Sequence, residues 1–312
     1  IDTSPAGHQP MISSDQRYVL SYNGEVYNFR ELRAELEAEG YKFRSKTDSE
    51  VVLYSLAKWG KNALLKFNGM FALAFWDRKK QKLLLARDRY GVKPLYYAKQ
   101  GYLFTFGSEQ KAITVQNNFK KKINKPALLE YFTFQNIFTN QTFLKDIYIL
   151  EPGTFLTLQN GSTDYKMERY WDYYFNEPTQ KASEKEYIEE LDRLFQQAVK
   201  RQLISDVELG AYLSGGMDSG SITAIAAKEF PYLKSFTCGF DLSSASGIEL
   251  AFDERPSAEA MSSRFKTEHY EMVLKAGDLE RCLDKYTWHL EEPRVGQSYP
   301  NFYAAKLASK FG

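Results

Sequence analysis

Residues 213–219 read Leu-Ser-Gly-Gly-Met-Asp-Ser and combine the residue types that bind phosphate. Two adjacent glycines let the backbone approach a ligand closely, and two serines add hydroxyl donors. Residues 207–213 alternate apolar and polar side chains as a strand does, and residues 221–228 favour a helix. Unpaired amides and the dipole at a helix start favour an anion. The spacing therefore predicts a phosphate-binding loop between a strand and a helix, and with it ATP chemistry.

This loop differs from the Walker type, because it lacks the Gly-Lys-Ser/Thr ending whose lysine reaches the β- and γ-phosphates. Its order, Ser-Gly-Gly-x-Asp-Ser, resembles the loop of the ATP-pyrophosphatase family. The resemblance implies that the pyrophosphate is held while the α-phosphorus is attacked, which gives an adenylated intermediate. The alternative is an ordinary glycine-rich turn. Under the ATP interpretation, the nucleotide contacts are Leu213, Ser214, Gly215, Gly216, Asp218, Ser219 and Cys238, and Asp218 also holds Mg²⁺.

The first half of the chain has the pattern of a strand, two helices and a hairpin. Residues 18–22 predict the strand. Residues 29–39 predict an amphipathic helix that opens with a capping-box pattern, and residues 50–58 predict a second helix. Residues 70–76 and 82–86 flank a polar turn, as the strands of a β-hairpin do.

Further motifs accompany these elements in a distinctive order. They are residues 7–11 (Gly-His-Gln-Pro-Met), 23–25 (Asn-Gly-Glu), 87–97, 106–113 and 150–154 (Leu-Glu-Pro-Gly-Thr). Together they resemble the N-terminal-nucleophile glutaminase domain of class II glutamine amidotransferases, specifically that of glutamine-dependent asparagine synthetases. With the ATP loop, the resemblance covers nearly the whole chain. It implies an α+β glutaminase domain, an αββα sandwich, over residues 1–165. An α/β ATP-pyrophosphatase domain with a doubly wound parallel sheet is expected over residues 183–312.

The resemblance assigns roles to four residues of the first half. Hydrolysis of the glutamine amide creates a tetrahedral oxyanion that preorganised donors must hold, and Asn23 and Gly24 match the family's oxyanion-hole pair. Asn23, Glu25 and Asp48 match its glutamine-binding residues, with the two carboxylates fixing the α-ammonium. From the residues alone, a turn at Asn23-Gly24 and a plain helix N-cap at Asp48 remain as alternatives.

The family's nucleophile is a cysteine at the N-terminus of the mature chain, whose own α-amine serves as the base. The two cysteines of this sequence, Cys238 and Cys282, both lie in its second half and do not match that position. The chain opens on Ile1 without a methionine and stops directly after a helical pattern, so we expect a fragment cut at both ends. The expectation for the fragment is no glutaminase activity.

The second half is predicted to form a parallel sheet with helices. Residues 184–201 predict a long helix whose apolar face packs against the sheet, and residues 235–240 predict a strand. Strand-helix-strand order favours parallel strands, with ligands at their carboxyl ends. Leu213 and Cys238 lie near such ends, where the resembling family holds adenosine, and core packing is an equal alternative. Asp253 matches an acidic pair that introduces a helix in the family, or is a plain N-cap.

The reaction that the resemblance implies joins both halves. Aspartate attacks the α-phosphorus of Mg-ATP, giving β-aspartyl-AMP and pyrophosphate, and ammonia from glutamine then displaces AMP to give asparagine. The cofactors are ATP and Mg²⁺. Two alternatives remain: a related amidotransferase, or an amide-forming or cyclising synthetase, with a different acid substrate; and a paralogue that binds nucleotide without turnover.

Composition limits the partners. The 312 residues are 43% hydrophobic and 26% charged, and the formal net charge is +1, so no large field attracts nucleic acid or an anionic membrane. No apolar run approaches the length of a membrane-spanning helix. Two cysteines suggest no disulfide framework, which fits a reducing cytoplasm. We expect small-molecule partners, glutamine, aspartate and ATP, and leave the oligomeric state open, with a homodimer as one option.

Overall fold

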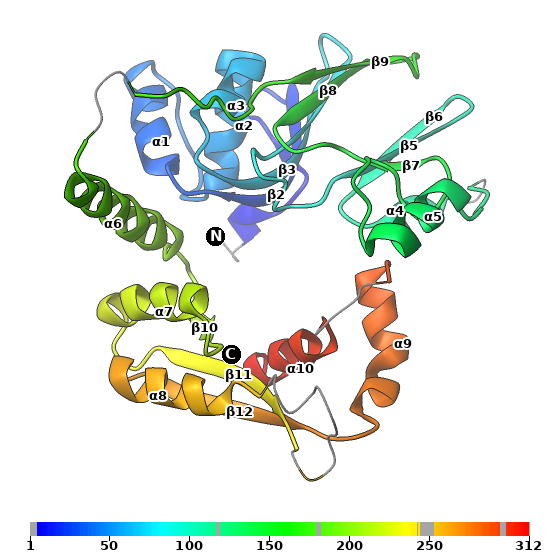
Figure 1. Ribbon diagram of the computed structural model, residues 1–312. Helices are drawn as coiled ribbons and strands as arrows, with labels where there is room; N and C mark the ends of the chain where they lie inside the picture. Colours follow the sequence, from blue (N-terminus) through cyan, green and yellow to red (C-terminus); the bar gives the residue numbers. More distant parts are fainter. Residues whose placement is uncertain are drawn as a thin grey trace. The chain divides into compact units, whose positions relative to one another are not determined.

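The computed structural model describes residues 5–116, 119–178, 182–241, 243, 253–293 and 298–311 (Figure 1). The chain divides into two compact units, Ile1–Glu177 and Pro178–Gly312. Each unit has its own strands and helices, and each is described by itself.

Two antiparallel sheets form the centre of the first unit. One has six strands in the order β1-β2-β3-β4-β8-β9, and the other has three in the order β6-β5-β7. The elements are η1 (Pro5–Gly7), β1 (Met11–Ile12), β2 (Tyr18–Val26), α1 (Phe29–Ala38), α2 (Asp48–Trp59), η2 (Gly60–Asn62), α3 (Ala63–Lys66), β3 (Gly69–Asp77), β4 (Lys82–Arg87), β5 (Tyr96–Gln100), β6 (Leu103–Gly107), α4 (Gln110–Thr114), α5 (Lys125–Phe134), β7 (Ile147–Ile149), β8 (Thr154–Gln159) and β9 (Tyr165–Arg169).

The two sheets pack face to face and are covered by helices. One buried cluster joins Ala72, Ala74 and Leu85 of the larger sheet to Tyr97 of β5. Strand β3 is buried on both faces, as a strand between two layers requires. Helix α2 packs on β2 and α1, and α4 packs on β5 and β6. The layers therefore follow helix, sheet, sheet, helix, and the predicted αββα sandwich is confirmed.

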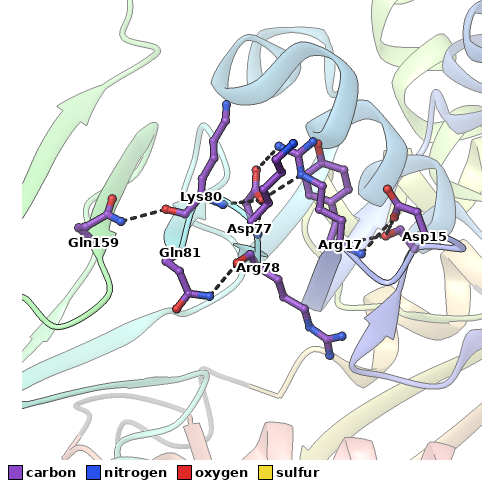
Figure 2. A network of polar contacts seen from close by, with 10 residues as sticks. Asp15, Arg17, Asp77, Arg78, Lys80, Gln81 and Gln159 are labelled. Carbon is purple, nitrogen blue, oxygen red and sulfur yellow. Dashed lines mark hydrogen bonds and ion pairs between the residues drawn. The ribbon is translucent and has the colours of Figure 1, made fainter.

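A polar network fixes the register of the larger sheet where β2 begins and β3 turns into β4 (Figure 2). Arg17 grips Asp77 with two hydrogen bonds of 3.1 and 2.9 Å. Asp77 Oδ1 also accepts the N–H groups of Lys79 and Lys80 at 2.9 and 3.0 Å. Gln159 of β8 donates to the Lys80 carbonyl at 2.9 Å. Because a slip of one residue would turn every side chain to the other face, this network also sets which side chains of β2 lie on each face of the sheet.

The predicted elements of the first unit are present, with three differences. The hairpin and both helices are confirmed, although α2 begins at Asp48. The strand predicted over 18–22 continues to Val26. The capping box at α1 is wrong, because the Asn28 side chain bonds to Lys66 O and Asn68 N–H and makes no bond within the helix start.

The second unit contains a parallel sheet in the order β10-β11-β12, as predicted. Its elements are α6 (Glu184–Gln202), β10 (Gly210–Tyr212), α7 (Met217–Glu229), β11 (Lys234–Phe240), α8 (Arg255–Phe265), β12 (Glu268–Leu274), α9 (Asp278–Leu290) and α10 (Ser298–Ala308). None of the helices in the described ranges is long and apolar enough to cross a membrane.

Helices cover both faces of this sheet. The Phe236 and Tyr270 rings pack against Phe311, which follows α10. A Cβ on Gly239 would instead lie 2.4 Å from Arg255 Nε, at the start of α8. Because Phe236 and Gly239 differ by an odd number of residues in β11, they point to opposite faces. The doubly wound arrangement is therefore confirmed.

Helix α6 differs from its prediction. A capping box of Ser183 and Glu186 opens it, and its main contact is with α7. Val199 is buried, but Tyr187 is 51% and Leu191 68% exposed. The prediction that the whole apolar face packs against the sheet is wrong, since only the end near α7 is covered.

Candidate functional site

Asn23 and Gly24 lie inside β2, opposite Ala72 and Phe71 of β3. The turn interpretation of these two residues is therefore wrong. A Cβ on Gly24 would lie 2.2 Å from the Met70 carbonyl oxygen and 2.6 Å from Phe71 Cα, so the two strands approach too closely for any residue but glycine. Asn23 is exposed, and its Nδ2 donates a hydrogen bond to another side chain of the same unit.

The direction of the Gly24 N–H follows from its neighbour across the sheet. Phe71 donates its N–H to Asp88 Oδ2 at 3.2 Å and accepts the Asp88 N–H at 2.8 Å. The N–H and C=O of a residue in an antiparallel strand point to the same side. Phe71 thus turns both groups away from β2, and Gly24, paired with it, turns its own N–H away from β3.

The two nearest N–H groups on that side of β2, those of Tyr22 and Val26, have side-chain acceptors. Gln9 Oε1 accepts the Tyr22 N–H, and Asp48 Oδ2 accepts the Val26 N–H at 3.0 Å. Strand β1 pairs with β2 only at residues 19 and 20 and so does not reach this part of the edge. Among the described residues, no acceptor is recorded for the Gly24 N–H, which lies between two satisfied neighbours and beside the Asn23 amide. Two adjacent residues thus offer donors on one stretch of strand.

Asp48 of α2 holds residues 22–26 of β2 in place. Its side chain is fully buried, and Oδ2 accepts both the Tyr22 O–H at 2.9 Å and the Val26 N–H. Tyr22 and Val26 bracket residues 23–25, so one carboxylate clamps both ends of the segment. Burial and the nearby Asp48 charge raise the pKa of Tyr22 well above its ordinary value. The tyrosine therefore stays a donor.

The N-cap alternative for Asp48 is wrong. Thr47 caps α2 by accepting the Ser49 N–H at 3.2 Å, and Asp48 is the first residue of the helix. Glu25 lies on the same segment as Asn23 and is half-buried. Its Oε2 accepts the Tyr27 O–H at 3.0 Å, and burial together with Glu25 raises the pKa of Tyr27. The structure thus brings all four predicted residues of the first half to one part of β2.

The predicted phosphate loop lies between β10 and α7. Ser219 Oγ accepts the Ser214 N–H at 3.1 Å and lies 2.8 Å from Ser214 Oγ, which accepts the Gly216 N–H at 3.1 Å. The two hydroxyls therefore link the start of the loop to the first turn of α7. A Cβ on Gly215 would lie 2.4 Å from Ser257 Cβ, so the loop passes tightly over α8.

Helix α7 begins at Met217, four residues earlier than predicted, which places Asp218 and Ser219 in its first turn. The first N–H groups of a helix have no intrahelical acceptor, and the N-cap residue, Gly216, has no side chain to supply one. The helix start thus offers main-chain donors to an anion.

Asp218 is exposed at this helix start. In the described ranges, no group of three or more His, Cys, Asp or Glu side chains could hold a metal ion. Asp218 offers a carboxylate at the start of α7. Such a donor fits Mg²⁺ bound with a nucleotide, because Mg²⁺ is commonly held by one or two carboxylates together with substrate phosphates.

Leu213 and Cys238 occupy the strand region beside the loop. Leu213 is buried, donates its N–H to the Phe236 carbonyl at 3.0 Å and accepts from Thr237 Oγ1. Cys238 is half-buried within β11, and burial raises the pKa of its thiol to about 11. At neutral pH this thiol is protonated, so it packs as a small apolar group.

The N-cap residue of α8 is Glu254, whose side chain makes no cap bond. Asp253, one residue earlier than an N-cap, accepts the Arg255 N–H at the helix start at 3.4 Å. Its carboxylate receives Arg255 Nε at 2.8 Å and Nη2 at 2.7 Å, and Arg255 also donates to the Phe240 carbonyl. The bond from Arg255 lowers the pKa of Asp253. This pair ties the end of β11 to the start of α8.

Comparison with known families places the chain. The family described as "Glutamine amidotransferase domain" matches residues 1–171, and the family described as "Asparagine synthase" matches residues 190–312. The chain belongs to the glutamine amidotransferase domain family through its first part, and its second part matches the asparagine synthase model. Among similar proteins, the glutamine-hydrolyzing asparagine synthetase 3 of Bacillus subtilis (strain 168) is 36% identical over 305 residues, covering 94% of this chain and 48% of the relative.

A second curated relative and a solved structure are also similar to the chain. A putative glutamine-hydrolyzing asparagine synthetase 2 of Methanocaldococcus jannaschii is 33% identical over 330 residues, covering all of this chain and 62% of the relative. The chain thus spans about half the length of the curated relatives it matches. The solved glutamine phosphoribosylpyrophosphate amidotransferase from B. subtilis aligns with a TM-score of 0.39 and 14% identity, over 86% of this chain and 49% of that chain.

Sequence reasoning missed the groups that support the candidate site on β2. Buried Asp88 accepts four main-chain N–H groups, those of Phe71, Tyr90, Val92 and Lys93. Arg87 donates to the carbonyls of Lys93, Leu150 and Gly91, and burial lowers the pKa of its guanidinium. A charged pair directly after a buried strand was the signal, because a buried charge requires partners.

Proposed function

We propose that the complete protein is a glutamine-hydrolysing asparagine synthetase. Residues 1–165 form its glutaminase domain, and residues 183–312 belong to its ATP-pyrophosphatase domain. The carrying observation is that one chain matches both families, the glutamine amidotransferase domain over residues 1–171 and asparagine synthase over residues 190–312. Small molecules, namely glutamine, aspartate and ATP, are the partners, and the location is the cytoplasm, with a homodimer as one option for the oligomeric state. Neither nucleic acid nor membrane takes part.

At the glutaminase site, Asn23 Nδ2 and the Gly24 N–H form the oxyanion hole. Preorganised donors of this kind stabilise charge that develops in the transition state. Support comes from the Gly24 N–H, which lies between two satisfied neighbours, and from the amide beside it. Asn23, Glu25 and Asp48 bind glutamine, and Asp48 acts through the segment it clamps. The nucleophilic cysteine is not among residues 1–312, since both cysteines lie in the second unit.

At the synthetase site, the aspartate β-carboxylate attacks the α-phosphorus of ATP. The bond between the α-phosphorus and the bridging oxygen breaks, and pyrophosphate leaves. Ammonia then attacks the acyl carbon of β-aspartyl-AMP, loses a proton and expels AMP. Ser214, Gly215, Gly216 and Ser219 bind the phosphates, Asp218 holds Mg²⁺, and Leu213 and Cys238 border the adenosine. Bound Mg²⁺ would offset negative charge on the leaving pyrophosphate.

The test is product stoichiometry with the complete protein. With ATP, glutamine and aspartate we expect asparagine, glutamate, AMP and pyrophosphate in equal amounts. Pyrophosphate release supported by another acid and not by aspartate would assign a related amide-forming or cyclising synthetase instead. Nucleotide binding without any turnover would assign a non-catalytic paralogue. Residues 1–312 alone should release no glutamate from glutamine.

A further inference from the structure

Ser108 makes a contact that neither the family match nor the proposed reaction assigns. Asn23 Nδ2 donates a hydrogen bond to Ser108 Oγ at 3.1 Å. The two residues are 85 positions apart, and they join different sheets of the first unit, since Asn23 lies in β2 and Ser108 directly follows β6. Ser108 belongs to the motif over residues 106–113, for which the proposed function gives no task.

The segment that carries Ser108 is firmly anchored. Gly107 pairs with Tyr96 at the end of β6, and a Cβ on Gly107 would lie 3.1 Å from Ala112 Cβ of α4. Gln110 and Ile113 of α4 are buried. A strand end on one side and a buried helix on the other thus fix where the Ser108 hydroxyl lies.

A fixed hydroxyl matters because an asparagine side chain turns about two bonds, whereas an oxyanion hole requires preorganised donors. The Asn23 amide carries two N–H groups. When one donates to Ser108, the plane of the amide is set and the other N–H is left for a ligand. Gly24 needs no such help, because the sheet itself orients its N–H.

We propose that Ser108 is a positioning residue of the glutaminase site, which holds the Asn23 amide so that its second N–H and the Gly24 N–H meet the same oxyanion. The inference rests on the proposed function. Ser108 itself does not touch the reacting atoms. Its removal therefore weakens stabilisation of the tetrahedral intermediate and leaves the binding of glutamine nearly unchanged.

The experiment uses the complete protein and the variants Ser108→Ala and Ser108→Thr. For Ser108→Ala we expect kcat of glutamine hydrolysis to fall ~10-fold, with KM within ~2-fold, since one donor is loosened and not deleted. Ser108→Thr keeps the hydroxyl and should restore most of kcat. Asparagine synthesis from added ammonia should be unaffected. Glutamate γ-semialdehyde, which forms a tetrahedral adduct with the cysteine, should bind ~10-fold more weakly to Ser108→Ala.

Two controls separate positioning from general structure. Ser162→Ala removes a hydroxyl that accepts a main-chain N–H in a turn of the same unit, away from β2, and should leave kcat unchanged. In an Asn23→Ala background, Ser108→Ala should add no further loss. A Ser108→Ala variant with wild-type kcat, or with equal losses in glutamine- and ammonia-dependent synthesis, would overturn the inference. A wild-type protein that hydrolyses no glutamine would overturn the proposed function and the inference with it.

Discussion

Two aspartates, each in the first turn of a helix, differ in almost every other respect. Asp48 of α2 is fully buried and accepts hydrogen bonds from Tyr22 and Val26. Asp218 of α7 is exposed, and no hydrogen bond to it is recorded among the described residues. The Asp48 carboxylate already accepts hydrogen bonds within the protein, whereas the Asp218 carboxylate is open to a ligand. A similar helix position therefore serves structure in one unit and is available for binding in the other.

The elements around each aspartate explain the difference. The first site lies in the middle of nine-residue β2, within a six-stranded sheet, so its backbone is positioned by pairing on one side and by side chains on the other. The second follows three-residue β10, and its loop is held by the hydroxyls of Ser214 and Ser219 and by close packing of Gly215 on α8. Substitutions in the first site should therefore change stability before binding, and those in the second should change binding before stability.

Gly24→Ala should have the largest effect. The added Cβ overlaps a backbone carbonyl of β3 that cannot move without opening the sheet, so we expect the free energy of unfolding to fall by ~3 kcal/mol or more. Hydrogen exchange over residues 18–26 and urea unfolding would measure it. Gly101→Ala is the control: its Cβ meets no atom within 4 Å, and only its φ of +60° opposes alanine, at a cost of ~1 kcal/mol. Equal losses would refute the close approach.

Asp48→Ala and Asp218→Ala test the comparison directly. Asp48→Ala leaves two buried donors without an acceptor and should lower stability by ~2–3 kcal/mol. Asp218→Ala removes an exposed charge and should change stability by less than ~1 kcal/mol, while ATP binding in the presence of Mg²⁺ weakens ~10-fold. Unfolding curves and titration calorimetry give both quantities. If Asp218→Ala destabilised the protein more than Asp48→Ala, the assignment of Asp48 to stability and of Asp218 to binding would be refuted.

The individual elements could be predicted because local patterns carried them, whereas the αββα layering followed from the family resemblance. Period-two and helical spacing, together with strand-helix-strand order, indicated the hairpin, the helices and the parallel sheet. Those patterns failed at 23–25, where Asn-Gly is typical of a turn. The structure keeps Gly24 in the strand because β3 passes too close for a side chain, and contacts between distant strands are not visible in local spacing.

The supports of each site were harder to predict than the sites themselves. The spacing suggests that Asp48 is an N-cap, but Thr47 is the N-cap residue. Asp48 instead accepts hydrogen bonds from Tyr22 and Val26, which lie more than 20 positions earlier in the chain. Helix α7 begins at Met217 because Gly216 adopts an extended N-cap conformation, which shifts Asp218 from the loop into the helix. A side-chain hydrogen bond thus decides which residue caps α2, and a backbone conformation decides where α7 begins.

A smaller effect is expected within the phosphate loop, from Gly215→Ala against Gly216→Ala. The Gly215 Cβ would overlap Ser257 Cβ at 2.4 Å, whereas the Gly216 Cβ would meet only Ser214 Oγ, at 3.1 Å. Because α8 must shift to admit the first methyl group, ATP affinity should fall ~10-fold for Gly215→Ala and ~3-fold for Gly216→Ala, with Mg²⁺ present. Calorimetry on both variants ranks them. The opposite ranking would mean that Ser257 yields freely.

The smallest effect concerns alkaline pH. The pKa of Tyr22 is raised in the native state by burial and by Asp48, so above about pH 10 the unfolded chain releases this proton while the native protein keeps it. The native state then binds more protons than the unfolded state, and stability falls as pH rises. Tyr22→Phe should remove this share of the slope, less than ~1.4 kcal/mol per pH unit, although it also weakens the fold at neutral pH. Urea midpoints between about pH 9 and pH 11 measure the slope.

Tyr102→Phe is the control: it removes the hydroxyl of a fully exposed tyrosine and should leave the slope as in the wild type. An unchanged slope in Tyr22→Phe would show that the clamp around residues 23–25 opens before the tyrosine can ionise.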